Sequence, residues 1–309
     1  MNMASEGSGY GKVILFGEHF VVHGVPAVAA ALRKSTVASI EDSDKFKVVD
    51  NRPETPGYKE KKKEQADQAI KNVIDYLKVD VEKHPIKVTF SGDLVAASGV
   101  GASAAQCAAL ARALNQHFQL GLDDDGINKA AYEGEKAYHG TPSGIDNTAA
   151  TYGGVIFFTK SDPPKIERIS MAKPIEIVEG NTGLISDTKE VVADVRKKME
   201  ESPEEFGKIF KRAGEIAQEA KQALADADPE KIGKLMDENQ ELLRKITVSC
   251  DELEQLIKIA KDNGAVGAKL TGTGRGGLMV SLTPGNELQE KVAKSMEGAG
   301  FKVFRNSIG

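Results

Sequence analysis

The sequence predicts an α+β protein of two domains, each built from helices and strands. Its 309 residues exceed the usual size of one domain. Short apolar runs bounded by glycine or proline alternate with segments of helical periodicity. Beyond residue 174 the composition shifts to long helices rich in Glu, Lys and Ala. We therefore expect domains at residues 1–174 and 175–309, with a ligand cleft between them.

The elements of the first domain follow from its apolar pattern. We expect strands at residues 12–16 and 27–32, and then a helix whose apolar residues recur from 66 to 77. A strand at 86–90 precedes an Ala-rich helix at 102–118, which contains neither Gly nor Pro. A helix at 128–138 and a strand at 155–159 complete this domain.

The second domain is predicted to be mostly helical, with a few strands near its end. The expected strands lie at 266–270, 278–282 and 302–304, and a glycine-rich turn joins the first two. The expected helices lie at 189–199, 203–225, 229–245, 251–262 and 287–297.

Composition excludes several classes of protein. The formal net charge is −5, and the 41 Lys and Arg residues are spread along the chain among 46 Asp and Glu residues, so neither nucleic acid nor a membrane surface is an expected partner. Only Cys107 and Cys250 occur, which is typical of a reducing compartment without structural disulfides. No charged leader or span of roughly 20 apolar residues is present. We expect a cytoplasmic protein, either monomeric or homodimeric.

A glycine-rich loop opens the Ala-rich helix and predicts a phosphate site. Glycines let the backbone approach a ligand, and a helix N-terminus offers unpaired N–H groups. Ser103 adds a hydroxyl that is placed to hold Mg²⁺. The expected nucleotide contacts are Ser98, Gly99, Val100, Gly101, Ala102, Ser103 and Ala104.

Other glycine patterns compete with this interpretation. Gly99, Gly101 and Ala104 also match the dinucleotide pattern G-x-G-x-x-A, but a turn follows the helix where a strand and an acidic residue are required. No ordinary P-loop sequence occurs. Residues 272–277 are either a plain hairpin turn or a loop that approaches a ligand, and Arg275 within them is available to phosphate or merely solvated.

Three charged residues each have a structural and a functional interpretation. Lys12, at the edge of an apolar run, is either an ordinary strand-end lysine or a cation at the site. Asp146 either caps a helix together with Ser143 or accepts a proton from a hydroxyl. Glu135 is either a solvated helix charge or a buried carboxylate that needs a partner such as Mg²⁺.

Glu18 and His19 follow the first strand, where a loop is expected to face a site. His19 and His23 lie four residues apart, a spacing that on a helix can bind zinc. Glu18 precedes the first histidine and the residues between the two are β-branched, so polar substrate contacts fit better.

Four segments resemble the galactokinase, homoserine kinase, mevalonate kinase and phosphomevalonate kinase (GHMP) superfamily, and the mevalonate branch most closely. Two motifs point to that branch: the Gly-Glu-His after the first strand and the Pro-Ser-Gly-Ile-Asp-Asn run. The segments are Gly-Lys-Val-Ile-Leu-Phe-Gly-Glu-His at 11–19, Gly-Val-Gly-Ala-Ser-Ala-Ala at 99–105, Gly-Glu at 134–135 with His-Gly-Thr-Pro-Ser-Gly-Ile-Asp-Asn at 139–147, and Lys-Leu-Thr-Gly-Thr-Gly-Arg-Gly-Gly at 269–277.

The resemblance implies a fold and a reaction. It implies a first domain like domain 2 of ribosomal protein S5, a second, ferredoxin-like domain, and transfer of the γ-phosphoryl group of ATP to (R)-mevalonate in isoprenoid biosynthesis. Lys12 would lower the pKa of the reacting hydroxyl and Asp146 would take its proton, while Ser103 and Glu135 hold Mg²⁺. The implied substrate contacts are Lys12, Glu18, His19, Asp146, Thr188, Lys189, Gly272 and Thr273.

Departures from the family pattern leave alternatives open. Tyr10 stands where the family usually has Pro, Ala102 where it has Ser, and Thr273 and Arg275 interrupt a run of glycines. Phosphomevalonate, homoserine or a sugar is an alternative substrate. A ligand sensor that keeps the scaffold without catalysis is the alternative from another class.

Overall fold

The computed structural model describes residues 5–97 and 99–309. The chain forms two compact units: the first holds residues up to 12 and 32–153, and the second holds residues 13–31 and 154–309. The strands β1 (Ser5–Phe16) and β2 (Ala27–Asp42) pair with each other and run through both units. The boundary expected at residue 174 stays a prediction, and the compact units divide the chain at other places because these two long strands belong to both.

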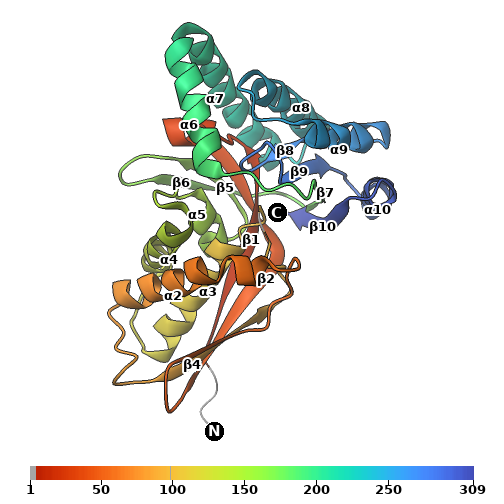
Figure 1. The fold of residues 1–309 in the computed structure, drawn as a ribbon. Coiled ribbons are helices and arrows are strands. Elements are labelled where there is room, and N and C mark those ends of the chain that lie inside the picture. The colour runs from red at the N-terminus through yellow and green to blue at the C-terminus, as the bar shows by residue number, and fades with distance from the viewer. Residues whose placement is uncertain (1–4, 98) are drawn as a thin grey trace. The chain divides into compact units, whose positions relative to one another are not determined.

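In the first unit, helices pack on a sheet in which β2 pairs with β1 and β4, and β4 pairs with β3 (Figure 1). The core joins apolar residues of β2 and β4 to α2, α3 and α4. Strand β4 pairs antiparallel with β2, Phe90 opposite Ala38, and parallel with β3. The elements that lie wholly in this unit are β3 (Lys47–Asp50), α1 (Tyr58–Lys61), α2 (Lys63–Tyr76), β4 (Ile86–Gly92), α3 (Ala102–His117), α4 (Asp124–His139) and α5 (Ile145–Tyr152).

Helix α3 is the centre of this unit, and its composition explains why. Small alanines let α4 and α5 approach it closely, and eleven of its sixteen residues are buried. At Gly134 on α4, an added Cβ would lie 2.6 Å from the Sγ atom of Cys107 on α3. This close packing fixes the start of α3 relative to α4 and α5, which carry the acidic residues of the candidate site.

The second unit contains a four-stranded antiparallel sheet in the order β10-β7-β9-β8. Helices α8 and α9 contact β8, and α10 contacts β7 and β10 (Figure 1). The elements of this unit are η1 (Phe20–His23), β5 (Val155–Thr159), β6 (Lys165–Ile169), β7 (Ile175–Asn181), α6 (Thr188–Glu201), α7 (Pro203–Ala225), α8 (Pro229–Lys245), α9 (Asp251–Asp262), β8 (Gly267–Thr271), β9 (Leu278–Leu282), α10 (Asn286–Gly298) and β10 (Lys302–Ile308).

The predicted α+β class is confirmed, and so are the long helices. Three strands were missed, namely β3, β6 and β7. Strand β7 carries two glutamates, a composition that is unusual in strands. One of them, Glu179, is fully buried and accepts a hydrogen bond from Asn306 on β10, so its partner lies far away in sequence. Within the described residues, none of the helices combines the length and the apolar character needed to cross a bilayer.

Candidate active site

Lys12 and Asp146 form an ion pair in the first unit, with the Lys12 Nζ atom 3.1 Å from Oδ1 of Asp146. Lys12 comes from β1 and its side chain is 4% exposed, whereas Asp146 lies in the first turn of α5 and is 26% exposed. The pair therefore places a buried ammonium beside a carboxylate that solvent still reaches. Such a pair can orient a hydroxyl group and accept its proton.

The structural interpretations of these two residues are wrong. A strand-end lysine would reach into solvent, but Lys12 is buried. A capping box would place Ser143 at the N-cap of α5, but Gly144 occupies that position, and the Ser143 hydroxyl accepts from the N–H of Ile145 and not from that of Asp146. The Asp146 carboxylate points instead to Lys12.

The glycine loop lies against Lys12. The backbone N–H of Lys12 donates to the carbonyl oxygen of Val100 at 2.9 Å. Gly101 is the N-cap of α3 with φ of 72°, and a Cβ there would lie 2.6 Å from Cγ of Lys12. Glycine is thus required at this position both by the left-handed backbone and by the lysine side chain beneath it.

The start of α3 has the properties of an anion site. Its N-cap residue, Gly101, has no side chain that could cap the N-terminus, and its first turn contains no acidic residue, so its first N–H groups suit an anion. Ser103 lies in this turn and is partly buried. Ser98, the first of the expected nucleotide contacts, lies outside the described residues. After α3 the chain turns into α4 and not into a strand, so the dinucleotide interpretation is wrong.

Glu135, on α4, is fully buried and not a solvated charge. Within the described part of the chain, neither of its carboxylate oxygens has a hydrogen-bond partner. Burial, with a smaller contribution from the nearby Asp146, raises the pKa of Glu135 to about 8, although the Ser103 hydroxyl and Lys12 act to lower it. The Ser103 hydroxyl lowers the pKa as a hydrogen-bonding group would, although by distance and angle it is not a hydrogen-bond partner of either oxygen.

A divalent cation fits this environment. A buried carboxylate without a partner costs folding free energy, and a cation beside it would offset that cost. Ser103 and Glu135 supply a hydroxyl and a carboxylate oxygen, the hard ligands that Mg²⁺ prefers. The residues present are therefore suited to hold Mg²⁺ next to a phosphate on the start of α3.

In the second unit, Glu18 forms an ion pair with Lys269, and both side chains are 0% exposed. The Lys269 ammonium also donates to the carbonyl oxygen of Leu270 at 2.6 Å. Burial lowers the pKa of Lys269, while Glu18 acts to raise it. The Glu18 carboxylate therefore neutralises a buried lysine, and its expected contact with substrate stays a prediction.

His19 is buried, and its ring has a defined tautomer. Its Nε2 atom lies 2.6 Å from the carbonyl oxygen of Thr273, so Nε2 carries the proton and donates it. Burial lowers the pKa of His19 to about 4, with smaller effects from Arg275 and His23, so the ring is neutral near pH 7. The Nδ1 atom is then a buried acceptor, and it has no hydrogen-bond partner among the described residues.

The glycine-rich loop at 272–277 connects β8 to β9 as a hairpin, with Thr271 paired to Leu278. At Gly274, with φ of 73°, a Cβ would lie 2.2 Å from the carbonyl oxygen of Val248, so packing explains this glycine. Gly272 has open space around it. The hairpin interpretation is therefore correct for the path of the chain, and the space at Gly272 leaves room for a ligand.

Two side chains attach this loop to α6. The Thr273 hydroxyl lies 2.8 Å from that of Thr188, which brings two expected substrate contacts together. Arg275 forms an ion pair with Asp194, so it is neither merely solvated nor free to bind phosphate in this state. Lys189 is exposed, and its backbone N–H donates to the Asp187 cap at 2.7 Å.

Sequence reasoning assigned no role to Lys269 or His139, although both lie inside the motifs. A lysine in the middle of a buried strand was the available signal for Lys269, because such a charge requires a partner. His139 lies one turn after Glu135 on α4, with its Nε2 atom 3.6 Å from Oε2 of Glu135. The i, i+4 spacing of the two residues was the available signal for His139.

One departure from the family pattern has a structural explanation. Tyr10 packs against Gly153, where an added Cβ would lie 3.0 Å from the tyrosine ring. Tyr10 therefore occupies space that the glycine leaves open and lies two residues before Lys12 without displacing it.

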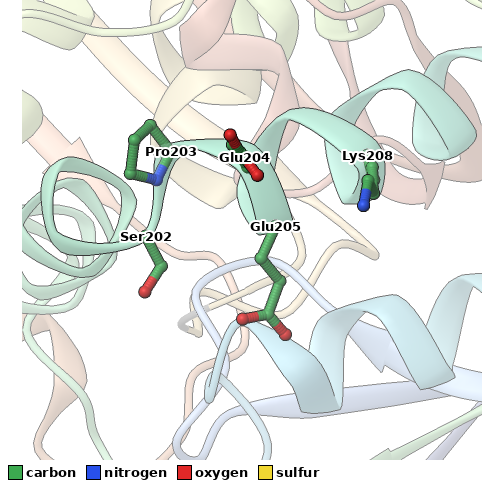
Figure 2. Close-up of a pocket in the computed structure, with 5 residues that line it drawn as sticks. All are labelled: Ser202, Pro203, Glu204, Glu205 and Lys208. Atoms are coloured by element: carbon green, nitrogen blue, oxygen red, sulfur yellow. The ribbon is translucent and has the colours of Figure 1, made fainter.

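A surface depression of about 520 Å³ lies at the start of α7. Figure 2 shows it lined by Ser202, Pro203, Glu204, Glu205 and Lys208. None of the expected site residues lines it, and its two carboxylates are unsuited to phosphate. We do not assign the active site there.

Comparisons with known proteins agree over nearly the whole chain. The family models described as "GHMP kinases N terminal domain" and "GHMP kinases C terminal" match residues 66–154 and 220–302. Mevalonate kinases of Pyrococcus abyssi and Pyrococcus horikoshii are 34% and 35% identical over 310 residues, covering 94% of this chain and 91% of each relative. The crystal structure of L. major mevalonate kinase in complex with R-mevalonate is 38% identical with a TM-score of 0.93, covering 100% of this chain and 96% of that one.

Proposed function

We propose that this chain, which belongs to the GHMP kinase family, transfers the γ-phosphoryl group of ATP to the 5-hydroxyl of (R)-mevalonate and forms 5-phosphomevalonate for isoprenoid biosynthesis. The observation that carries this function is the similarity, over almost its full length, to enzymes named mevalonate kinase, one of them in complex with R-mevalonate. The ion pair of Lys12 and Asp146 supports the chemistry from an independent direction.

We assign proton transfer to Asp146 and hydroxyl activation to Lys12. An ammonium beside a hydroxyl stabilises the developing alkoxide, and a carboxylate within hydrogen-bond reach accepts the proton. Because Lys12 is nearly inaccessible while Asp146 is partly exposed, the carboxylate is the group that meets an incoming alcohol first. The attacking oxygen then carries more negative charge toward the γ-phosphorus atom.

The glycine-rich loop at 99–104 is proposed to bind the triphosphate through backbone N–H groups at the start of α3. Ser103 and Glu135 would hold Mg²⁺, which when bound neutralises charge on the β- and γ-phosphates. Use of ATP follows from the kinase family, and the metal is our proposal.

The substrate contacts of the second unit are also proposals. The Nδ1 atom of His19 is a buried acceptor, and it suits a hydroxyl group of mevalonate as donor. Glu18 is also a proposed substrate contact, and its ion pair with Lys269 supports the loop that carries His19. Thr188, Lys189, Gly272 and Thr273 lie at the start of α6 and in the adjoining loop, and they would complete the contacts. The expected monomer or homodimer stays a prediction.

A coupled assay of ADP release tests the function directly. Mevalonate should be turned over with a kcat/KM at least about 100-fold above those for phosphomevalonate, homoserine and galactose, because a site built for one polar group pattern rejects others strongly. Turnover of another alcohol in preference to mevalonate would contradict the substrate assignment. Binding of ATP and mevalonate without any ADP release would favour the ligand sensor.

A further inference from the structure

Three side chains of the first unit bring one ligand atom each to a common point. The ligand atoms of Glu135, His139 and Asp146 all lie within 4.8 Å of one another. Glu135 and His139 are one turn apart on α4, and Asp146 comes from the first turn of α5. A single ion with metal–ligand bonds of about 2.0–2.3 Å can be reached by atoms at this separation after small side-chain rotations.

The state of Glu135 is an independent sign of a ligand. Its side chain is 0% exposed, and within the described residues neither of its buried oxygens has a hydrogen-bond partner. A carboxylate in that state is costly unless a cation accompanies it. The histidine and the aspartate lie on the side from which solvent enters, since they are 38% and 26% exposed.

The imidazole decides which cation suits the site. Mg²⁺ prefers oxygen ligands and keeps several of its water molecules, whereas imidazole is a good ligand for Zn²⁺ and for the later first-row transition metals. We propose that Glu135, His139 and Asp146 form a binding site for a divalent transition-metal cation such as Co²⁺ or Zn²⁺, which binds in the absence of nucleotide. This goes beyond the proposed reaction, in which Ser103 and Glu135 hold Mg²⁺ together with ATP.

Occupation of this site has a consequence for the ion pair. Asp146 is held 3.1 Å from Lys12, and a cation that takes its carboxylate competes with the ammonium for the same oxygens. The bound metal therefore removes the proton acceptor and inhibits phosphoryl transfer. This consequence rests on the proposed function, whereas the binding itself does not.

Cobalt binding to the nucleotide-free protein tests the site. Co²⁺ is titrated into the full chain, and its visible d–d absorption and heat of binding are recorded. One equivalent should bind, and His139→Gln should weaken binding by at least about tenfold, because loss of a supporting group alone typically costs 10–100-fold. Equal affinity of the two proteins, or no cobalt binding by the unmodified chain, overturns the proposal.

His117→Gln is the matched control. His117 also faces a carboxylate, with its Nε2 atom 3.3 Å from Oδ1 of Asp42, but it is not part of the three-residue cluster. This variant should bind cobalt as the unmodified chain does, with unchanged basal activity. Glu135→Gln provides a second variant of the cluster and should also lose the absorption band. Circular dichroism without metal verifies that each variant is folded.

A zinc inhibition assay distinguishes the proposed metal site from the proposed function. With Mg²⁺ and ATP in excess, Zn²⁺ should slow the unmodified enzyme, and His139→Gln should need at least about tenfold more Zn²⁺ for the same fractional loss of its own rate. Cobalt binding that depends on His139 supports the site even if mevalonate is not turned over, which would contradict only the proposed function. Equal zinc sensitivity of both proteins contradicts the inhibitory consequence.

Discussion

The Nζ atom of Lys12 lies 3.1 Å from Oδ1 of Asp146, and the two residues are separated by 134 positions in sequence. Strand β1 supplies the ammonium and the first turn of α5 supplies the carboxylate. Helix α3 packs against both elements: it contacts α5, and Cβ atoms added at Gly7 and Gly9 of β1 would meet its backbone. The acid–base pair is therefore a product of the packing around α3.

Asp146→Asn should lower kcat by roughly 10²–10⁴-fold while ATP and mevalonate still bind, because the amide cannot accept the proton. Steady-state kinetics and calorimetric binding measure the two effects. Asp75→Asn is the control, since Asp75 also pairs with a lysine, Lys71, but on an exposed helix face. A loss of stability without loss of kcat in Asp146→Asn would assign the residue a structural role only.

Gly101→Ala should raise the KM for ATP and lower kcat by at least about tenfold. The new Cβ would meet Cγ of Lys12 at 2.6 Å and so displace the lysine or the phosphate loop. Gly121→Ala is the matched control, because Gly121 has φ of 69° and nothing within 4 Å of an added Cβ. Both variants should lose about 1–2 kcal/mol of stability from backbone strain. If their kinetics are alike, close packing of Lys12 against the loop is not important for activity.

His19 should make the protein less stable in mild acid. The unfolded chain binds a proton on this ring near pH 6.5, whereas in the folded protein burial lowers the pKa to about 4. The contribution of the neutral ring to the free energy of unfolding is therefore complete above pH 6.5. It is lost as the pH falls from 6.5 to 4, which lowers that free energy by up to about 3 kcal/mol. Urea unfolding across this range measures it.

His19→Gln should reduce this pH dependence, and the exposed His84→Gln should not. The same reasoning predicts that the KM for mevalonate shows no inflection near pH 6.5, since the ring stays neutral there. An inflection at that pH that disappears in His19→Gln would show that the ring titrates normally and is not desolvated.

Lys269→Met should destabilise the protein by about 3–5 kcal/mol, because it leaves the buried Glu18 carboxylate without its cation. Adding Glu18→Gln should restore part of that loss, and a double-mutant cycle in urea measures the coupling. Lys258→Met breaks an exposed pair with Asp262 and should cost less than about 1 kcal/mol. Similar losses in the two single variants would indicate that the buried pair has little net effect.

Local patterns in the sequence predicted the helices well. The Ala-rich segment at 102–118 became α3 at Ala102–His117, because it lacks Gly and Pro and its small side chains suit close packing. Motif spacing also placed Lys12, Ser103, Glu135 and Asp146 in the same unit. These features depend on neighbours in sequence or on short motifs, so they can be recognised without coordinates.

Features that depend on distant partners could not be predicted in this way. Glu179 is buried in a strand, where Asn306, 127 positions away, donates a hydrogen bond to its carboxylate. Glu18 pairs with Lys269, which is 251 positions away, and the sequence alone did not indicate this partner. In both residues the amino-acid type suggests exposure, and only tertiary contacts make burial tolerable.

The two attachments of the loop at 272–277 have a mechanical consequence. Thr273 is hydrogen-bonded to Thr188, and Arg275 forms an ion pair with Asp194. Thr188 and Asp194 are six positions, or about 9 Å, apart along the axis of α6. Because α6 is a rigid helix, two contacts to it prevent the loop from rotating about either contact. A shift of α6 would therefore move the loop and the Thr273 carbonyl oxygen that fixes the ring of His19. Substitutions elsewhere on that helix would in this way change the binding of the alcohol substrate.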